Sequence, residues 1–116
     1  MIDLINPALA LMTIAFGAFG FLAPRFTASA LDLTPGQTTM GLSEMRASVG
    51  GLFVAIGLFA IWSGDAMAYA MIGVAYAGAA AGRLISILVD KAPPRKAGLY
   101  FALEAGPAAY LLLANL

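Results

Sequence analysis

Four long apolar runs dominate the pattern of hydrophobic and polar positions along the chain. They cover residues 4–22, 46–62, 66–89 and 97–116, and short polar or charged segments separate them. Each run is close to the length of about 20 residues with which a helix crosses a bilayer. None shows the strict alternation of a half-buried strand. The pattern therefore predicts an all-α integral membrane protein: one domain over residues 1–116, built as a four-helix transmembrane bundle.

The residues between the runs predict where the helices end. Pro24 closes the first run, because proline cannot continue a helix. Ser63, Gly64 and Asp65 predict a tight turn, in which Asp65 caps the third helix. The first run also has some features of a signal peptide. Its start carries Asp3 and no Lys or Arg, however, so a membrane span is the better interpretation.

The connection over residues 24–42 is mixed in character. Phe26, Ala30 and Leu33 recur at three- to four-residue spacing after Pro24. This spacing fits a short amphipathic helix on the inner membrane surface, with proline in its first turn. It fits a partly ordered loop equally well, and both interpretations stay open.

Composition supports the membrane assignment and narrows the chemistry. Hydrophobic residues make up 62% of the chain and charged residues 10%, with a mean hydropathy of +0.93. Soluble domains have about 45–50% apolar and about 25% charged residues. The formal net charge of zero argues against nucleic acid as a partner. The chain contains no Cys and no His, so we expect no disulfide, thiol or imidazole chemistry and no cofactor or metal.

Basic residues predict the orientation in the membrane. The side that holds both termini and the Ser63–Asp65 turn carries no Lys or Arg. The other side, with the adjoining start of the second run, carries Arg25, Arg46, Lys91, Arg95 and Lys96. Cytoplasmic loops are enriched in such residues. We therefore expect a bacterial inner-membrane protein with both termini in the periplasm.

Arg83 and Glu104 are ionisable residues inside apolar runs, where charges are costly and usually face the protein interior. Counted from the charged connection at residues 90–96, both lie roughly 10–12 Å into the membrane. The third and fourth helices are consecutive and antiparallel. The matched depth of Arg83 and Glu104 therefore predicts an ion pair between them, in which the guanidinium can form two hydrogen bonds to the carboxylate.

Further polar residues accompany this pair. Tyr76 lies seven residues before Arg83 on the same helix stripe, and Tyr100 lies one turn before Glu104. Glu44 and Arg46 enter the second helix from the same side, followed by Gly50 and Gly51, which would allow close helix approach. The predicted buried polar cluster comprises Glu44, Arg46, Tyr76, Arg83, Tyr100 and Glu104. It is either a polar pocket open to the cytoplasm or a structural ion pair that fixes two helices in register.

Small residues form a second pattern. Gly98, Ala102 and Gly106 repeat every four residues in the fourth helix, roughly opposite Glu104. Gly78 and Gly82 repeat the same spacing in the third. Such stripes allow helices to approach closely in membranes. They form a predicted helix-packing face, which serves either a partner protein or packing inside the bundle.

The order of several short motifs resembles an uncharacterised bacterial membrane family, known as domain of unknown function 4345. The motifs are Leu22-Ala23-Pro24, Glu44-Met45-Arg46-Ala47 with Gly50-Gly51, Gly82-Arg83 and Glu104. The resemblance implies a four-span fold without an established activity. It also marks Glu44, Arg46, Arg83 and Glu104 as its polar positions. At this point in the chain the resemblance leads us to expect an acidic residue followed by Gly. Here Asp90 is followed by Lys91, so the shape of that loop could differ from the family's.

These observations favour a non-enzymatic membrane protein that acts as an accessory or assembly subunit of a larger membrane complex. The expected partners are membrane lipids and either other membrane subunits or further copies of the chain. The alternative is a small oligomeric transporter or channel that uses Glu104 and Arg83. A lipid or quinone enzyme is the least favoured class, because no nucleophile–base pair or metal-ligand spacing is visible.

The orientation can be tested with reporter fusions. A reporter that is active only in the cytoplasm, fused after Leu116, should give no signal, because the basic residues hold the opposite side in the cytoplasm. The same reporter inserted between Lys91 and Arg95 should be active. Strong activity after Leu116 would overturn the assignment.

Overall fold

Helices make up all of the regular structure that the computed structural model describes, over residues 3–34 and 36–116. Four of these helical segments are long and apolar enough to cross a membrane: Ile5–Leu22, Met40–Ser63, Ala66–Val89 and Pro94–Asn115. The predicted all-α class and its four spans are thereby confirmed. The chain divides into two units, of which one ends at Ser63 and the other begins at Gly64, so the single domain over residues 1–116 stays a prediction.

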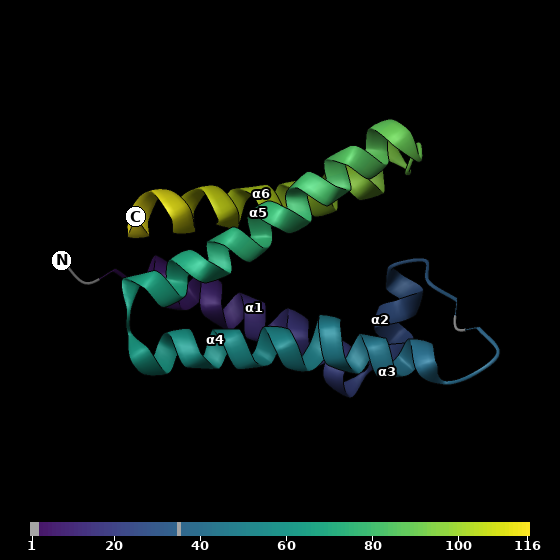
Figure 1. Ribbon diagram of the computed structural model, residues 1–116, viewed down its shortest axis with the longest axis horizontal. Helices are drawn as coiled ribbons and strands as arrows, with labels where there is room; N and C mark the ends of the chain where they lie inside the picture. The colour runs from purple at the N-terminus through teal and green to yellow at the C-terminus, as the bar shows by residue number, and fades with distance from the viewer. Residues whose placement is uncertain (1–2, 35) are drawn as a thin grey trace. The chain divides into compact units, whose positions relative to one another are not determined.

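The first unit contains two long helical segments and one short helix (Figure 1). The elements are α1 (Ile5–Leu22), α2 (Pro24–Ala30), α3 (Met40–Arg46), the π-helical turn η1 (Ala47–Gly51) and α4 (Leu52–Ser63). The last three follow one another without a break and form one membrane span. This segment begins six residues before the predicted start of the second span at position 46.

Glycine allows α1 and the η1–α4 segment to touch backbone to backbone. A methyl group at Gly20 would lie 2.5 Å from the carbonyl oxygen of Val49, and one at Gly50 would lie 2.6 Å from the amide nitrogen of Phe21. Such distances are far inside van der Waals contact. Gly17 and Gly57 are also without room for a side chain. The predicted close approach at Gly50 is thereby confirmed, and α1 is the neighbour.

The η1 turn lies at the centre of this contact. The amide of Leu52 donates to the carbonyl of Ala47, five residues back, which is the hydrogen bond of a π turn. Two adjacent glycines weaken the local preference for a regular α-helix. The wider turn occurs where Gly50 packs against the α1 backbone.

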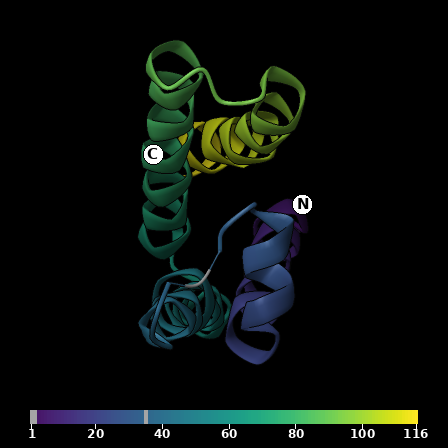
Figure 2. The ribbon, with the colours of Figure 1, turned by 90° about the vertical axis from the view of Figure 1, so that its right-hand side faces the viewer.

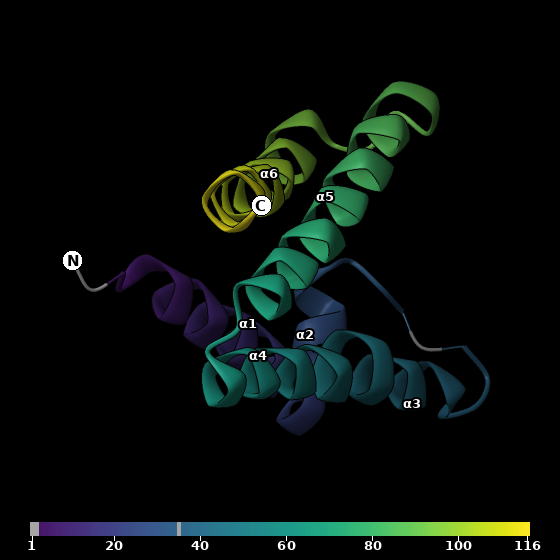
Figure 3. The ribbon, with the colours of Figure 1, turned by 60° about the vertical axis from the view of Figure 1, so that its left-hand side comes forward.

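A short helix, α2, is present within residues 24–42, as one of the two interpretations expected, but it ends at Ala30 and leaves Leu33 outside it. It starts with Pro24 in its first turn, where the missing N–H is not needed. Phe26 is 65% exposed, and its ring lies 6.0 Å from that of Phe19. Helix α2 contacts both α1 and α3 at one end of the first unit (Figures 1 and 3). Its contact with a membrane surface stays a prediction.

The second unit is a helical hairpin of α5 (Ala66–Val89) and α6 (Pro94–Asn115), joined by a short connection that Figure 2 shows clearly. Asp65 caps α5 as predicted, because its carboxylate accepts a hydrogen bond of 2.9 Å from the amide of Met67. Ile72 and Leu111 are each 1% exposed and are the most deeply buried large apolar residues of this unit. A methyl group at Gly73 would lie 2.9 Å from Cβ of Leu111, so the helices are tightly packed there.

The connection after α5 explains the departure at Asp90-Lys91. Lys91 has a φ of +58°, in the left-handed region that glycine adopts without steric cost. The amide of Ala92 turns back to the carbonyl of Ser86 at 3.4 Å. The bend that glycine would favour is therefore present, with lysine in its place.

The packing of the first unit generates a matched pair of predictions. Gly20→Ala should lower stability by about 1–3 kcal/mol, the usual cost of overpacking, because its new methyl group would meet backbone atoms. Gly78→Ala should instead leave stability unchanged or raise it by up to about 1 kcal/mol, since the position is helical and open. Thermal unfolding of both variants in one detergent provides the measurement. Equal effects would contradict the backbone contact.

Candidate functional site

The most strongly coupled polar residues of the second unit are Arg83 on α5 and Glu104 on α6. Nε of Arg83 donates to Oε1 of Glu104 at 3.1 Å, and Nη2 donates to Oε2 at 2.9 Å. These two parallel bonds form a bidentate ion pair. The predicted pair and its bidentate geometry are confirmed.

The periodicity of each helix directs these two residues toward each other. The buried side of α5 contains Tyr69, Tyr76 and Ala80, and Arg83 continues this stripe by one turn. The buried side of α6 contains Ala97 and Ala108, and Glu104 lies between them on the same side. The side chain of Glu104 is 15% exposed and that of Arg83 is 33% exposed. The carboxylate is thus enclosed between the helices, while the arginine reaches from the interface toward its edge.

Tyr100 adds a second contact to the arginine. Cζ of Arg83 lies 5.3 Å from the centre of the Tyr100 ring, a distance at which a cation is attracted to an aromatic face. Tyr100 and Glu104 are one turn apart on α6, so both hold Arg83 from the same helix. Tyr76 is 6% exposed and lies two turns from Arg83 on the stripe of α5 that faces α6. Four of the six predicted cluster residues therefore belong to one interface.

The other two predicted cluster residues, Glu44 and Arg46, are exposed and have partners within the first unit. Nη1 of Arg46 donates to the carbonyl oxygen of Phe21 at 2.6 Å. This carbonyl is in the last turn of α1, where helical carbonyls lack intrahelical donors and a cation is favourable. Glu44 instead accepts a hydrogen bond of 3.3 Å from the hydroxyl of Ser48. The expectation that both are buried is therefore wrong, because each has a partner at the surface of its own unit.

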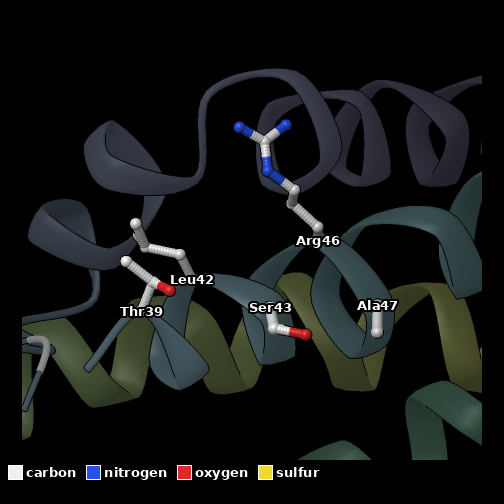
Figure 4. A pocket seen from close by; sticks show the side chains of 5 residues that line it. All are labelled: Thr39, Leu42, Ser43, Arg46 and Ala47. Carbon is white, nitrogen blue, oxygen red and sulfur yellow. The ribbon is translucent and has the colours of Figure 1, made fainter.

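Arg46 also lines an open depression that sequence reasoning did not identify (Figure 4). We call it the Arg46 depression, and it is formed by Thr39, Leu42, Ser43, Arg46 and Ala47. Thr39, Ser43 and Arg46 follow one another at four- and three-residue spacing, so they share one side of the helix. This spacing was a readable signal in the sequence. Neither Arg83 nor Glu104 lines this depression.

The predicted helix-packing face does not hold the hairpin together. Within the described hairpin, no atom of the facing helix lies within 4 Å of a methyl group placed at Gly78, Gly82, Gly98 or Gly106. Ala102 is exposed as well. Packing between α5 and α6 does not use these residues, and their service to a partner or to packing elsewhere in the bundle stays a prediction. The glycines that do pack tightly are Gly17, Gly20, Gly50, Gly57 and Gly73.

The arrangement favours a structural over a catalytic role for the ion pair. Both oxygens of Glu104 are engaged by Arg83, so the carboxylate is poorly placed to act as a base or to bind a further cation. Among the described residues, no three His, Cys, Asp or Glu residues gather in a group that could hold a metal ion.

Comparisons with known proteins identify a family. The model of the family described as "Domain of unknown function (DUF4345)" matches residues 4–115, nearly the whole chain. The chain therefore belongs to this family, as the resemblance implied. No curated protein and no solved structure matches the chain.

The ion pair generates a prediction for a double-mutant cycle. Arg83→Met and Glu104→Gln should each cost about 1.5–3 kcal/mol, the value of a charge-assisted hydrogen bond. Glu104→Gln should be the more harmful, because the orphaned arginine cannot lose its charge, whereas an orphaned Glu104 can take up a proton. The double mutant should recover part of the loss, since no unpaired charge remains. Thermal unfolding in detergent measures all three, and strictly additive losses would show that the residues are not coupled.

Proposed function

We propose that this member of the DUF4345 family is a non-enzymatic accessory or assembly subunit of a larger complex in the bacterial inner membrane, with both termini in the periplasm. The four apolar helices are those of a multi-pass membrane protein. The accessory role is argued from which surfaces of these helices pack within the chain and which stay exposed.

The observation that carries the proposal is the position of the small residues in α5 and α6. Gly78, Gly82, Gly98 and Gly106 have space around them, although small residues at four-residue spacing typically mark helix contacts in membranes. The hairpin uses other positions for its own packing, including Gly73 against Leu111. The hairpin itself leaves these small residues open, which supports our proposal that a helix of another subunit or of a second copy of the chain packs on them.

The apolar surface of the chain is consistent with such a role. In each of the four spans, 22% of the most apolar window is buried within the chain. Large side chains such as Leu113, at 83% exposed, and Trp62, at 81% exposed, contact little of the protein. Lipid covers such surface well, so the exposed area alone does not require a partner. The open glycines distinguish a contact surface from a lipid-facing one, because they remove side-chain bulk from it.

The geometry of the ion pair weighs against the alternative of a transporter or channel based on Glu104. A carboxylate held by a bidentate guanidinium is a poor carrier of protons or cations, since each must compete with the bound arginine. We therefore assign the Arg83–Glu104 pair to fixing α5 and α6 in register.

The assembly role can be tested on the full chain extracted from its native membranes in mild detergent. The wild type should migrate as a defined complex, with its partner or further copies in fixed stoichiometry. Gly98→Leu combined with Gly106→Leu should release the chain from this complex, because two large side chains would block the open stripe of α6. Leu113→Phe is the matched control at an exposed apolar position outside the stripe, and it should leave the complex intact.

Mass photometry and quantitative mass spectrometry of the purified samples give the readout. A wild-type chain that always runs as a monomer would contradict the proposal. Retention of the complex by the Gly98→Leu and Gly106→Leu double variant would show that the stripe is not the contact surface.

A further inference from the structure

We propose that the Arg46 depression binds the phosphate group of an anionic phospholipid, in the leaflet on the side of the basic connections. The proposal concerns a ligand of the first unit and does not rest on the accessory role assigned above. It combines the donor groups of the depression, their distance along the membrane span and the charges around them.

Arg46 offers hydrogen-bond donors that the described residues do not use. Its guanidinium carries five N–H groups, and the one protein bond formed is from Nη1 to the Phe21 carbonyl. That bond holds the end of the side chain in place against the α1–α2 junction, as its direction in Figure 4 shows. A planar guanidinium with free donors matches a phosphate in geometry as well as in charge. Because Arg46 is already held in position, binding would cost little additional side-chain entropy.

The depression also contains two hydroxyl groups, which Figure 4 shows apart from the guanidinium. Ser43 lies about one turn before Arg46, and Thr39 lies about two turns before it, on the same side of the segment. No described residue forms a side-chain hydrogen bond with either hydroxyl. Phosphate oxygens accept hydrogen bonds from hydroxyl groups as well as from arginine, so the depression offers donors to other oxygens of the same headgroup, away from the guanidinium (Figure 4).

The distance along the helix places these groups at the height of lipid headgroups. Seventeen residues separate Arg46 from Ser63 at the other end of the span, which corresponds to about 25 Å. The hydrocarbon core of a bilayer is about 30 Å thick. The long side chain of Arg46 therefore reaches the edge of the hydrocarbon core. Ser43 and Thr39 follow in the headgroup layer.

The local charges leave this position open to an anion. Glu44 is two residues from Arg46 and therefore on the other side of the helix, where its carboxylate lies 3.3 Å from the Ser48 hydroxyl. The salt bridge between Arg83 and Glu104 belongs to the second unit and does not involve Arg46. Arg25, in the same unit as Arg46, is exposed as well and adds a second positive charge to this end of the unit.

Exposed apolar side chains nearby are suited to the rest of a lipid molecule. Leu22, next to the residue that holds Arg46, is 73% exposed. Leu52, six residues further into the membrane from Arg46, is 55% exposed. Acyl chains can cover these side chains while the phosphate stays at Arg46. Soluble phosphate shares the headgroup chemistry but has no part that would use this apolar surface.

The test uses the full chain in mild detergent and native mass spectrometry with added phosphatidylglycerol. The wild type should retain a bound phosphatidylglycerol, and it should retain diacylglycerol, which has the same tails without the phosphate, far less. Arg46→Gln and Ser43→Asp should each weaken phosphatidylglycerol binding by about tenfold or more, the effect of losing a charge-assisted hydrogen bond. Arg95→Gln removes the same charge outside the depression and should change binding less than twofold.

Each other outcome overturns the proposal. Equal weakening by Arg46→Gln and Arg95→Gln would show diffuse attraction between charges, and equal retention of diacylglycerol would show binding through the tails alone. Displacement of the lipid by millimolar inorganic phosphate would assign the depression to soluble phosphate. Arg46→Gln also removes the bond to Phe21 and could unfold the first unit. Ser43→Asp leaves that bond in place, so unchanged lipid binding by this variant is decisive against the site.

Discussion

Inside a bilayer a polar group must find its partner within the protein, because the hydrocarbon offers none. The polar side chains of the spans obey this constraint. Thr13, which is 1% exposed, donates to the carbonyl of Leu9 at 2.8 Å, and Arg83 fills both oxygens of Glu104. No buried side-chain nitrogen or oxygen of the described residues lacks a hydrogen-bond partner. Because helices satisfy their own backbone, the few polar side chains in the spans determine where two helices must meet.

The two units solve helix contact in different ways. In the first unit the backbones of α1 and η1–α4 touch through Gly20 and Gly50, so the contact depends on the absence of side chains. In the second unit side chains take part in the contact: Leu111 packs against Gly73, and the Arg83–Glu104 pair joins the helices nearer their connection. A contact between backbones is disrupted by any side chain larger than that of glycine. A contact between side chains is disrupted when either of the two interacting residues is replaced. Substitutions should therefore affect the two units by different mechanisms.

Much of the fold was predictable because hydrophobic length is a strong signal in membranes. The four spans, the Asp65 cap and the Arg83–Glu104 pair follow from run lengths and from counting residues along antiparallel helices. The glycine contacts did not follow, since Gly20 and Gly78 have equal claims to packing until the neighbouring helix is known. Arg46 was assigned to a buried cluster because its charge was visible and its partner was not. Every residue has a backbone carbonyl, so the sequence does not show that the carbonyl of Phe21 is the one that accepts this hydrogen bond.

Arg46 and Arg83 show how the neighbouring helix decides the role of an arginine. Each lies seventeen residues from the nearer end of the Ser63–Gly64–Asp65–Ala66 turn, counted along its own helix. Across from Arg83, α6 supplies the Glu104 carboxylate, which accepts hydrogen bonds from Nε and Nη2 of the guanidinium. The pair thereby links the two helices. Across from Arg46, α1 supplies the Phe21 carbonyl, which takes one N–H and leaves the others available. A carboxylate partner compensates the charge of Arg83 and makes it a fixed link between helices. A neutral carbonyl leaves the charge of Arg46 uncompensated and able to bind an anion from outside the chain.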